Sequence, residues 1–288
     1  MMKVIIVNNV PYITIDDKIN MGFFEKQKSA LIIEGKGDYD IYSRLLLRTT
    51  INEEFDIVIG ESKSNILAHH DSNILNFSYI MLLDADYDHF KDSCRSDPQI
   101  IYTHFYTMEN YLTTSDVVKE TIHDFQNRGN LSVNEKLILE ETIDSLMPLI
   151  VACNMKLNLS WNIKIEDHKI YRWWDENNLK INIDKLKRYI IDELKKQGQN
   201  VDNSDFERLY SDTFEMIQEY PLDKIDCIIH GKRKFEVLYC FFKHYFSMAF
   251  KNRNEHIFKF DLLKNIFKSS FAIELLNQID KKMKEISA

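Results

Sequence analysis

Residues 31–38, Leu-Ile-Ile-Glu-Gly-Lys-Gly-Asp, and residues 79–88, Tyr-Ile-Met-Leu-Leu-Asp-Ala-Asp-Tyr-Asp, decide the fold of this chain. Each stretch is a short apolar run that stops at acidic residues. Continuous apolar runs of this length are typical of strands buried on both faces of a parallel sheet. Ligand sites in open α/β sheets lie beyond the carboxyl ends of the strands. We therefore expect Glu34 and the acidic run of residues 84–88 to share one carboxylate-lined site.

The first part of the chain alternates between strand and helix patterns. Core strands are predicted at 31–33, 56–59, 79–83 and 100–105, and helices at 38–48 and 65–75. This alternation predicts βαβ units and a mostly parallel four-stranded sheet with flanking helices. Ahead of the sheet, residues 4–7 and 12–15 flank an Asn-Asn-Val-Pro turn and predict a small β-hairpin.

From about residue 115 the pattern changes to helical periodicity with almost no strand signal. Helices are predicted within 133–151, 183–196, 205–219 and 234–250. We therefore predict an N-terminal β-hairpin extension at 1–27, an α/β domain at 28–120 and a mainly helical domain at 121–288.

The composition is ordinary for a globular protein, with 44% hydrophobic and 28% charged residues. Four widely spaced cysteines without a C-x-x-C pair indicate neither a zinc ribbon nor a disulfide scaffold, which favours a reducing compartment. No apolar stretch approaches the roughly 20 residues of a membrane span, and no signal-peptide pattern opens the sequence. We expect a cytoplasmic protein. Its net charge of −8 disfavours tight, non-specific binding of long DNA by this chain alone.

The acidic run of residues 84–88 carries the strongest chemical signal. Its three alternating carboxylates repel one another, and a bound hard cation such as Mg²⁺, which prefers oxygen ligands, removes that cost. An EF-hand would need Gly and Glu where this chain has His89 and Arg95. A haloacid-dehalogenase-type phosphatase has Thr or Val in place of Asp88. The run therefore predicts a metal-dependent phosphoryl-transfer site, with a solvated acidic loop as the alternative.

Two further segments add acidic candidates. Glu34 is a candidate metal ligand or general acid/base, Gly35 lets phosphate approach the backbone, and Asp38 would cap the following helix. The alternative is a plain turn between strand and helix. Glu109 follows the fourth predicted strand and would reach the same edge of the sheet, unless its segment is only an ordinary helix start.

The candidate substrate contacts are basic. Lys63 stands just beyond the second strand, and Lys232 and Arg233 belong to the basic run 231–234. Such side chains can hold a nucleic-acid backbone, but basic side chains are more often simply solvated. The tryptophans of the helical half either stack on bases or lie in the core. His69 and His70 show no metal-ligand spacing, and we expect both at the surface of a helix.

Glu34-Gly35 at the first strand, with Asp84-x-Asp86 at the third, resembles the TOPRIM domain of topoisomerases, primases and related nucleases over about residues 28–115. More narrowly, the chain is similar to a TOPRIM-like nuclease family of bacterial anti-phage defence effectors. The matching positions are Glu34-Gly35-x-x-Asp38, Gly60-x-x-Lys63, Asp84-x-Asp86, Glu109-Asn110-Tyr111-Leu112 and Gly231-Lys232. The resemblance implies that residues 28–120 form an α/β TOPRIM-like domain.

The same resemblance implies a metal-dependent endonuclease that uses Mg²⁺, with Mn²⁺ as a possible replacement. It implies a toxin held by an ABC-type ATPase subunit and released when a phage trigger protein is sensed through that ATPase. The released effector is expected to form a homodimer and to cleave host tRNA, which stops growth. The chain has no G-x-x-x-x-G-K-[ST] motif, in agreement with an ATPase supplied by another chain.

In the expected site, Asp84 and Asp86 hold the metal and Glu34 binds a second metal or acts as general base. The further candidates are Asp88 and Glu109 as metal ligands, and Lys63, Lys232 and Arg233 as substrate contacts. The third acid, Asp88, departs from the general TOPRIM pattern, and no tyrosine can be assigned as a topoisomerase nucleophile. Two alternatives stay open: a DNA-cutting TOPRIM nuclease of the overcoming-lysogenisation type, and a non-catalytic TOPRIM-like module that regulates an ATPase.

Overall fold

The computed structural model describes residues 12–21, 28–47, 55–88, 93–129, 133–220 and 228–287. These residues form two compact units. Of the described residues, those within 12–85, 93–103 and 273–287 belong to the first unit, and those within 86–88 and 104–272 belong to the second. The units differ from the three predicted segments, because the end of the chain belongs with the sheet and residues 104–120 belong with the helices.

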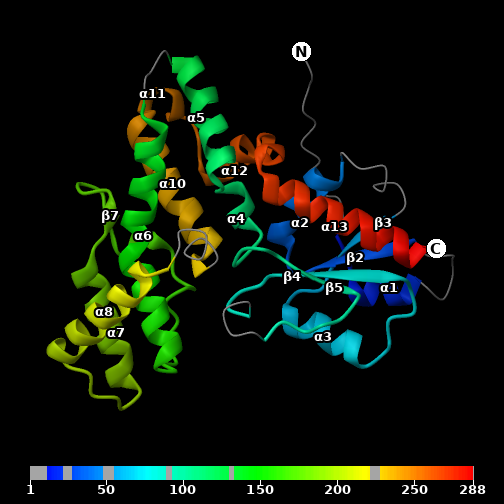
Figure 1. Ribbon diagram of the computed structural model, residues 1–288, viewed down its shortest axis with the longest axis horizontal. Coiled ribbons are helices and arrows are strands. Elements are labelled where there is room, and N and C mark those ends of the chain that lie inside the picture. The colour runs from blue at the N-terminus through cyan, green and yellow to red at the C-terminus, as the bar shows by residue number, and fades with distance from the viewer. Residues whose placement is uncertain are drawn as a thin grey trace. The chain divides into compact units, whose positions relative to one another are not determined.

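A five-stranded parallel sheet forms the centre of the first unit (Figure 1), with the strand order β1-β3-β2-β4-β5. The strands are β1 (Ile13–Thr14), β2 (Ser29–Ile33), β3 (Phe55–Ile59), β4 (Tyr79–Leu83) and β5 (Ile100–Tyr102). The helices that accompany them are α1 (Ile15–Met21), α2 (Lys36–Leu46), α3 (Lys63–Asp71) and most of α13 (Ser270–Ser287). Helix α13 lies on one side of the sheet and α3 on the other (Figure 1).

Strand β4 and all of β2 after Ser29 consist of buried, mostly aliphatic residues because helices cover both faces of the sheet. Ile32 and Met81 pack with Ile15 of α1 and Ile66 of α3 in one core cluster. Since side chains alternate across a strand, Leu31 points to the opposite face, and it is also fully buried. The predicted class, a parallel sheet with flanking helices followed by a mainly helical region, is confirmed.

One detail of the predicted sheet is wrong. The sheet has five strands rather than four, because residues 13 and 14 pair in parallel with Val58 and Ile59. The predicted hairpin stays a prediction, because its first strand, residues 4–7, lies outside the described residues. Pairing with β1 satisfies backbone groups that β3 would otherwise expose at the edge of the sheet.

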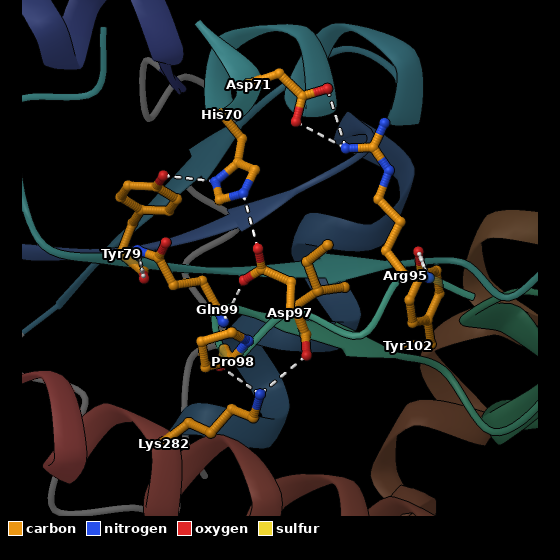
Figure 2. A network of polar contacts seen from close by, with 10 residues as sticks. His70, Asp71, Tyr79, Arg95, Asp97, Pro98, Gln99, Tyr102 and Lys282 are labelled. Carbon is orange, nitrogen blue, oxygen red and sulfur yellow. Dashed lines mark hydrogen bonds and ion pairs between the residues drawn. The ribbon is translucent and has the colours of Figure 1, made fainter. Parts of the chain in front are cut away.

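A polar network joins several segments of the first unit (Figure 2). The Nδ1 atom of His70 lies 2.8 Å from the hydroxyl of Tyr79, and its Nε2 atom lies 3.0 Å from Oδ2 of Asp97. Lys282 of α13 donates hydrogen bonds to the backbone carbonyls of Pro98 and Ile100. The prediction that His70 lies at the surface is wrong, because partners from residues 79 and 97 enclose it; His69 is also half-buried.

The second unit is mainly helical. Its helices are α4 (Glu109–Leu112), α5 (Ser115–Gly129), α6 (Glu135–Asn158), η2 (Ile170–Arg172), α7 (Ile183–Lys196), α8 (Asn203–Gln218), α10 (Gly231–Tyr245), α11 (Ser247–Phe250), α12 (Glu255–Lys264) and η3 (Ile266–Lys268). The strands β6 (Trp174–Asp175) and β7 (Lys180–Ile181) form a small antiparallel pair that the sequence pattern did not predict. Trp161, Trp173 and Trp174 are buried.

Within the described ranges, no helix has both the length and the apolar character needed to cross a membrane.

Candidate active site

The first unit brings together Glu34 of residues 31–38 and Asp84 of residues 79–88. Glu34 follows β2 and Asp84 follows β4, and these strands are neighbours in the sheet, with Ile33 opposite Leu82. The backbone N–H of Asp84 donates a hydrogen bond of 2.7 Å to Oε1 of Glu34. Both acidic residues are half-buried. The register of the parallel strands therefore brings together two residues that are fifty positions apart.

Lys63 lies beside the same strand end. It begins α3, where Ser62 caps the helix by accepting a hydrogen bond from the backbone N–H of Asn65. The Nζ atom of Lys63 donates a 2.6 Å hydrogen bond to the backbone carbonyl of Asp84 and lies 5.4 Å from the centre of the Tyr102 ring. This predicted phosphate contact is therefore half-buried next to Asp84 rather than an exposed surface lysine.

Asp38 has the predicted capping role. Helix α2 begins at Lys36, two residues earlier than predicted, so Asp38 lies in its first turn. One oxygen of the buried Asp38 carboxylate accepts a 3.1 Å hydrogen bond from the backbone N–H of Gly35. This contact fixes the turn directly after Glu34, because it closes the first turn of the helix against the end of the strand.

The remaining acids of the run belong to the second unit. Asp86 adopts a left-handed backbone conformation, with φ of 48°, and its N–H donates a 2.9 Å hydrogen bond to the carbonyl of Tyr106. The rings of Tyr87 and Tyr106 pack edge to face, with 4.8 Å between their centres. Burial raises the pKa of both tyrosines, and the Asp86 carboxylate adds to the effect on Tyr106. Both phenols are therefore protonated at neutral pH, and Asp88 ends this turn half-buried.

The beginning of α4 packs directly against the beginning of α10. The Asn110 side chain donates a 2.9 Å hydrogen bond to the carbonyl of Ile229 and accepts one of 3.0 Å from the N–H of Thr107. A Cβ atom on Gly231 would lie 2.6 Å from the backbone nitrogen of Asn110, so only glycine fits without a shift. The two motifs, which are about 120 residues apart, thus form one junction.

A carboxylate and a lysine face each other at this junction. The Nζ atom of Lys232 lies 3.8 Å from Oε1 of Glu109. Glu109 is only 7% exposed, and its other oxygen, Oε2, is buried without a hydrogen-bond partner. A buried carboxylate oxygen without a donor is costly. The Oε2 atom of Glu109 can therefore accept a hydrogen bond or bind a cation.

Arg233 points into the protein. Its Nη1 atom donates hydrogen bonds of 2.8 and 2.6 Å to the two carboxylate oxygens of Glu236, which also accepts one from the N–H of Ile170. Both charged residues are buried. Burial raises the pKa of Glu236, and the Ile170 N–H and the Arg233 guanidinium oppose that shift. The contacts of Arg233 are accounted for by a structural role in α10.

His230 was missed by the sequence interpretation, although it directly precedes the motif Gly231-Lys232. Its ring stacks on that of Tyr106 with 5.1 Å between the ring centres. Burial lowers the pKa of His230 to about 3, and the positive charges of Arg233 and Lys232 add to this shift. The imidazole is therefore neutral at pH 7.

Glu34 and Asp84 offer carboxylate oxygens, which are the ligands that Mg²⁺ prefers. Among the residues that the structure describes, however, no group of three or more His, Cys, Asp or Glu side chains is arranged to hold a metal ion. The donor chemistry fits Mg²⁺, and any such ion would need additional oxygens from water or substrate.

No protein-family model matches the chain. A search of curated proteins also finds no significant match.

Proposed function

We propose that the chain is a Mg²⁺-dependent TOPRIM nuclease that acts as the toxic effector of an anti-phage defence system and cleaves host tRNA. One observation supports the phosphoryl-transfer part of this proposal, and the tRNA and defence parts follow from the resemblance. Glu34 and Asp84 lie at the carboxyl ends of adjacent parallel strands and are joined by a hydrogen bond, and Lys63 is bonded to the carbonyl of Asp84. An acid pair with a lysine at this edge of a parallel sheet suits phosphoryl transfer.

Asp84 and Asp86 are the residues that would hold the metal in this proposal. Mg²⁺ usually keeps several waters and binds one or two carboxylates together with phosphate oxygens. A preformed group of three protein ligands is therefore not required. Mn²⁺ accepts the same oxygen ligands and is expected to replace Mg²⁺. When bound, the metal supplies charge neutralisation at the scissile phosphate.

The side chains of the chain have separate tasks in the proposed reaction. Glu34 takes the proton from the attacking water or ribose hydroxyl, and the Asp84 N–H orients its carboxylate for that role. Lys63 fixes the backbone at Asp84. In the second unit, Lys232 is the candidate contact for RNA phosphates, since it is exposed. Glu109 remains a candidate cation ligand through its unpartnered Oε2. Asp88 is kept as a further candidate metal ligand. Arg233 is not kept as a substrate contact, because it is buried.

The narrower resemblance, to AriB of the PARIS anti-phage system, extends the proposal to partners. An AriA-like ABC-type ATPase subunit would hold the chain inactive, and a phage trigger protein acting through that ATPase would release it. The released chain would act as a homodimer, and growth arrest by tRNA cleavage would be an abortive infection response.

Growth and small RNA in cells that express the chain with its ATPase partner and trigger test the proposal. Glu34→Gln keeps an oxygen that can accept from the Asp84 N–H but removes the negative charge. We expect the unsubstituted chain to arrest growth and fragment tRNA, and Glu34→Gln to reduce cleavage at least about 100-fold. Glu61→Gln is the matched control, because Glu61 is an exposed acid just after the neighbouring strand β3. Cleavage that persists in EDTA, or in Glu34→Gln, would contradict the proposal.

A non-catalytic TOPRIM-like module that regulates an ATPase is the second candidate. It is favoured by the lack of a three-ligand group in the described part of the chain. Intact RNA in the presence of partner and trigger, together with ATPase binding and no Mg²⁺ uptake, would support it. Degraded plasmid with intact tRNA would instead favour the DNA-cutting TOPRIM type.

A further inference from the structure

A pocket in the second unit lies among residues that the proposed reaction does not use. Its volume is about 320 Å³. Three aromatic side chains line it, those of Tyr171, Trp174 and Tyr239. The basic residues Lys243 and His244, from the last turn of α10, also line it. Pockets with an apolar lining and a few polar groups are typical small-ligand sites.

The aromatic rings of this pocket are held in place by contacts with their surroundings. The Tyr171 hydroxyl donates a 2.8 Å hydrogen bond to Oε1 of Glu255, and the Tyr239 hydroxyl donates one of 3.0 Å to the carbonyl of Arg253. The Trp174 ring is buried and packs edge to face on Phe241. Rings that are fixed before binding lose little conformational freedom when a ligand arrives, which favours affinity.

The pocket combines neutral and positive groups. Burial raises the pKa of the Cys240 thiol to about 12, so this lining residue is an uncharged, weakly polar group at neutral pH. Lys243 is exposed and carries a positive charge near the rings, although the exposed Glu176 also lines the pocket. A flat, uncharged ring attached to a phosphate matches this combination.

We propose that the pocket binds an unpaired base of the RNA substrate, which stacks on the aromatic side chains while Lys243 contacts an adjacent phosphate. The inference rests on the proposed function and names how the substrate is held. RNA-binding proteins commonly recognise bases splayed out of loops and ends. Because the chain has a net charge of −8, phosphate contacts alone offer little affinity, and base stacking supplies a contribution that does not depend on charge.

Binding of a fluorescein-labelled single-stranded RNA pentanucleotide to the full chain tests the pocket. The parent protein carries Glu34→Gln, so that the probe stays intact. We expect Tyr171→Ala to weaken binding roughly tenfold, because one stacking ring is lost. Tyr171→Phe keeps the ring and removes the hydroxyl, with its hydrogen bond to Glu255 and its contact with the Cys240 thiol, so its affinity should stay close to that of the parent. Phe260→Ala is the matched control, since Phe260 is 44% exposed, similar to Tyr171 at 42%, and does not line the pocket.

A second measurement needs no substitution in the pocket. On addition of the pentanucleotide, the indole N–H resonance of Trp174 should shift in an NMR spectrum. Parent-like affinity in Tyr171→Ala, equal losses in the Ala and Phe variants, or an unmoved Trp174 resonance at saturating RNA would overturn the inference.

Failure of the pocket and failure of the proposed function give different results. If Tyr171→Ala binds RNA with unchanged affinity and, with Glu34 restored, still cleaves tRNA, the base-binding proposal is wrong and the nuclease proposal stands. If RNA binding depends on the stacking ring but no RNA is cleaved, the nuclease proposal is wrong and the base-binding proposal stands.

Discussion

The strand ends of the first unit and the α4–α10 junction of the second bring distant residues together in different ways. Glu34 and Asp84 meet because β2 and β4 are adjacent parallel strands, and the order of such strands follows from local patterns. Asn110 and Gly231 meet because the beginnings of α4 and α10 pack on each other, and the hydrophobic periodicity of the sequence does not predict this contact. Adjacency in a parallel sheet can thus be anticipated, whereas helix contacts depend on which faces pack together.

The two regions also differ in burial. Glu34 and Asp84 are half-buried, while Glu109, Asn110 and Arg233 are buried. Losing a partner of a buried polar group leaves that group without solvent compensation, which costs more than the same loss at the surface. We therefore expect substitutions at the strand ends to affect activity mainly, and substitutions at the beginning of α10 to affect stability mainly.

Arg233→Ala should have the largest effect on stability. It leaves the buried Glu236 carboxylate without its bidentate partner, and breaking such pairs costs about 3–5 kcal/mol of the free energy of unfolding. Urea unfolding followed by circular dichroism measures the loss. Arg208→Ala is the control, because Arg208 forms an exposed i,i+3 pair with Asp205 whose removal should cost less than about 1 kcal/mol. An unchanged unfolding midpoint together with weaker RNA binding would instead restore Arg233 as a substrate contact.

Gly231→Ala should have the next largest effect. The added Cβ would meet the Asn110 backbone and the Thr107 hydroxyl at 2.6 Å, and relieving such overlap costs about 1–3 kcal/mol. Gly37→Ala is the matched substitution in the first unit, because a Cβ there meets nothing within 4 Å. In the first turn of α2 it should stabilise the protein by up to about 1 kcal/mol, because alanine has less conformational freedom than glycine in the unfolded chain. Equal unfolding midpoints for the two variants would show that the junction is looser than described.

Lys282→Ala should have the smallest effect. It removes hydrogen bonds from α13 to the carbonyls of Pro98 (Figure 2) and Ile100, for a loss of about 1 kcal/mol. The neighbouring exposed Lys281 provides the control substitution Lys281→Ala, which should change stability by less than about 0.5 kcal/mol. Amide hydrogen exchange near β5 gives a local readout. Faster exchange of Ile100 and Tyr102 in Lys282→Ala alone would confirm that Lys282 fastens this edge.

Much of the fold was predictable because apolar runs and helical periodicity are local features of the sequence. Strand β4 and helix α7 have the predicted bounds, since one is a short, wholly apolar run and the other has strong helical periodicity. Strand β1 was not predictable as part of the sheet, because two residues become a strand only through pairing with β3. The predicted fourth strand, residues 100–105, is shorter as β5 because the chain passes to the second unit at His104.

By itself, the sequence determined which residues stand at strand ends, because apolar runs and the acids that stop them are local features. That was enough to anticipate the pairing of Glu34 with Asp84. Only the tertiary structure decided that Lys63 bonds to the Asp84 carbonyl, that Glu109 faces Lys232, and that Arg233 turns inward to Glu236. The physical reason is that charge and residue type are properties of the sequence itself. The burial of a side chain and its hydrogen-bond and ion-pair partners depend on how distant segments pack.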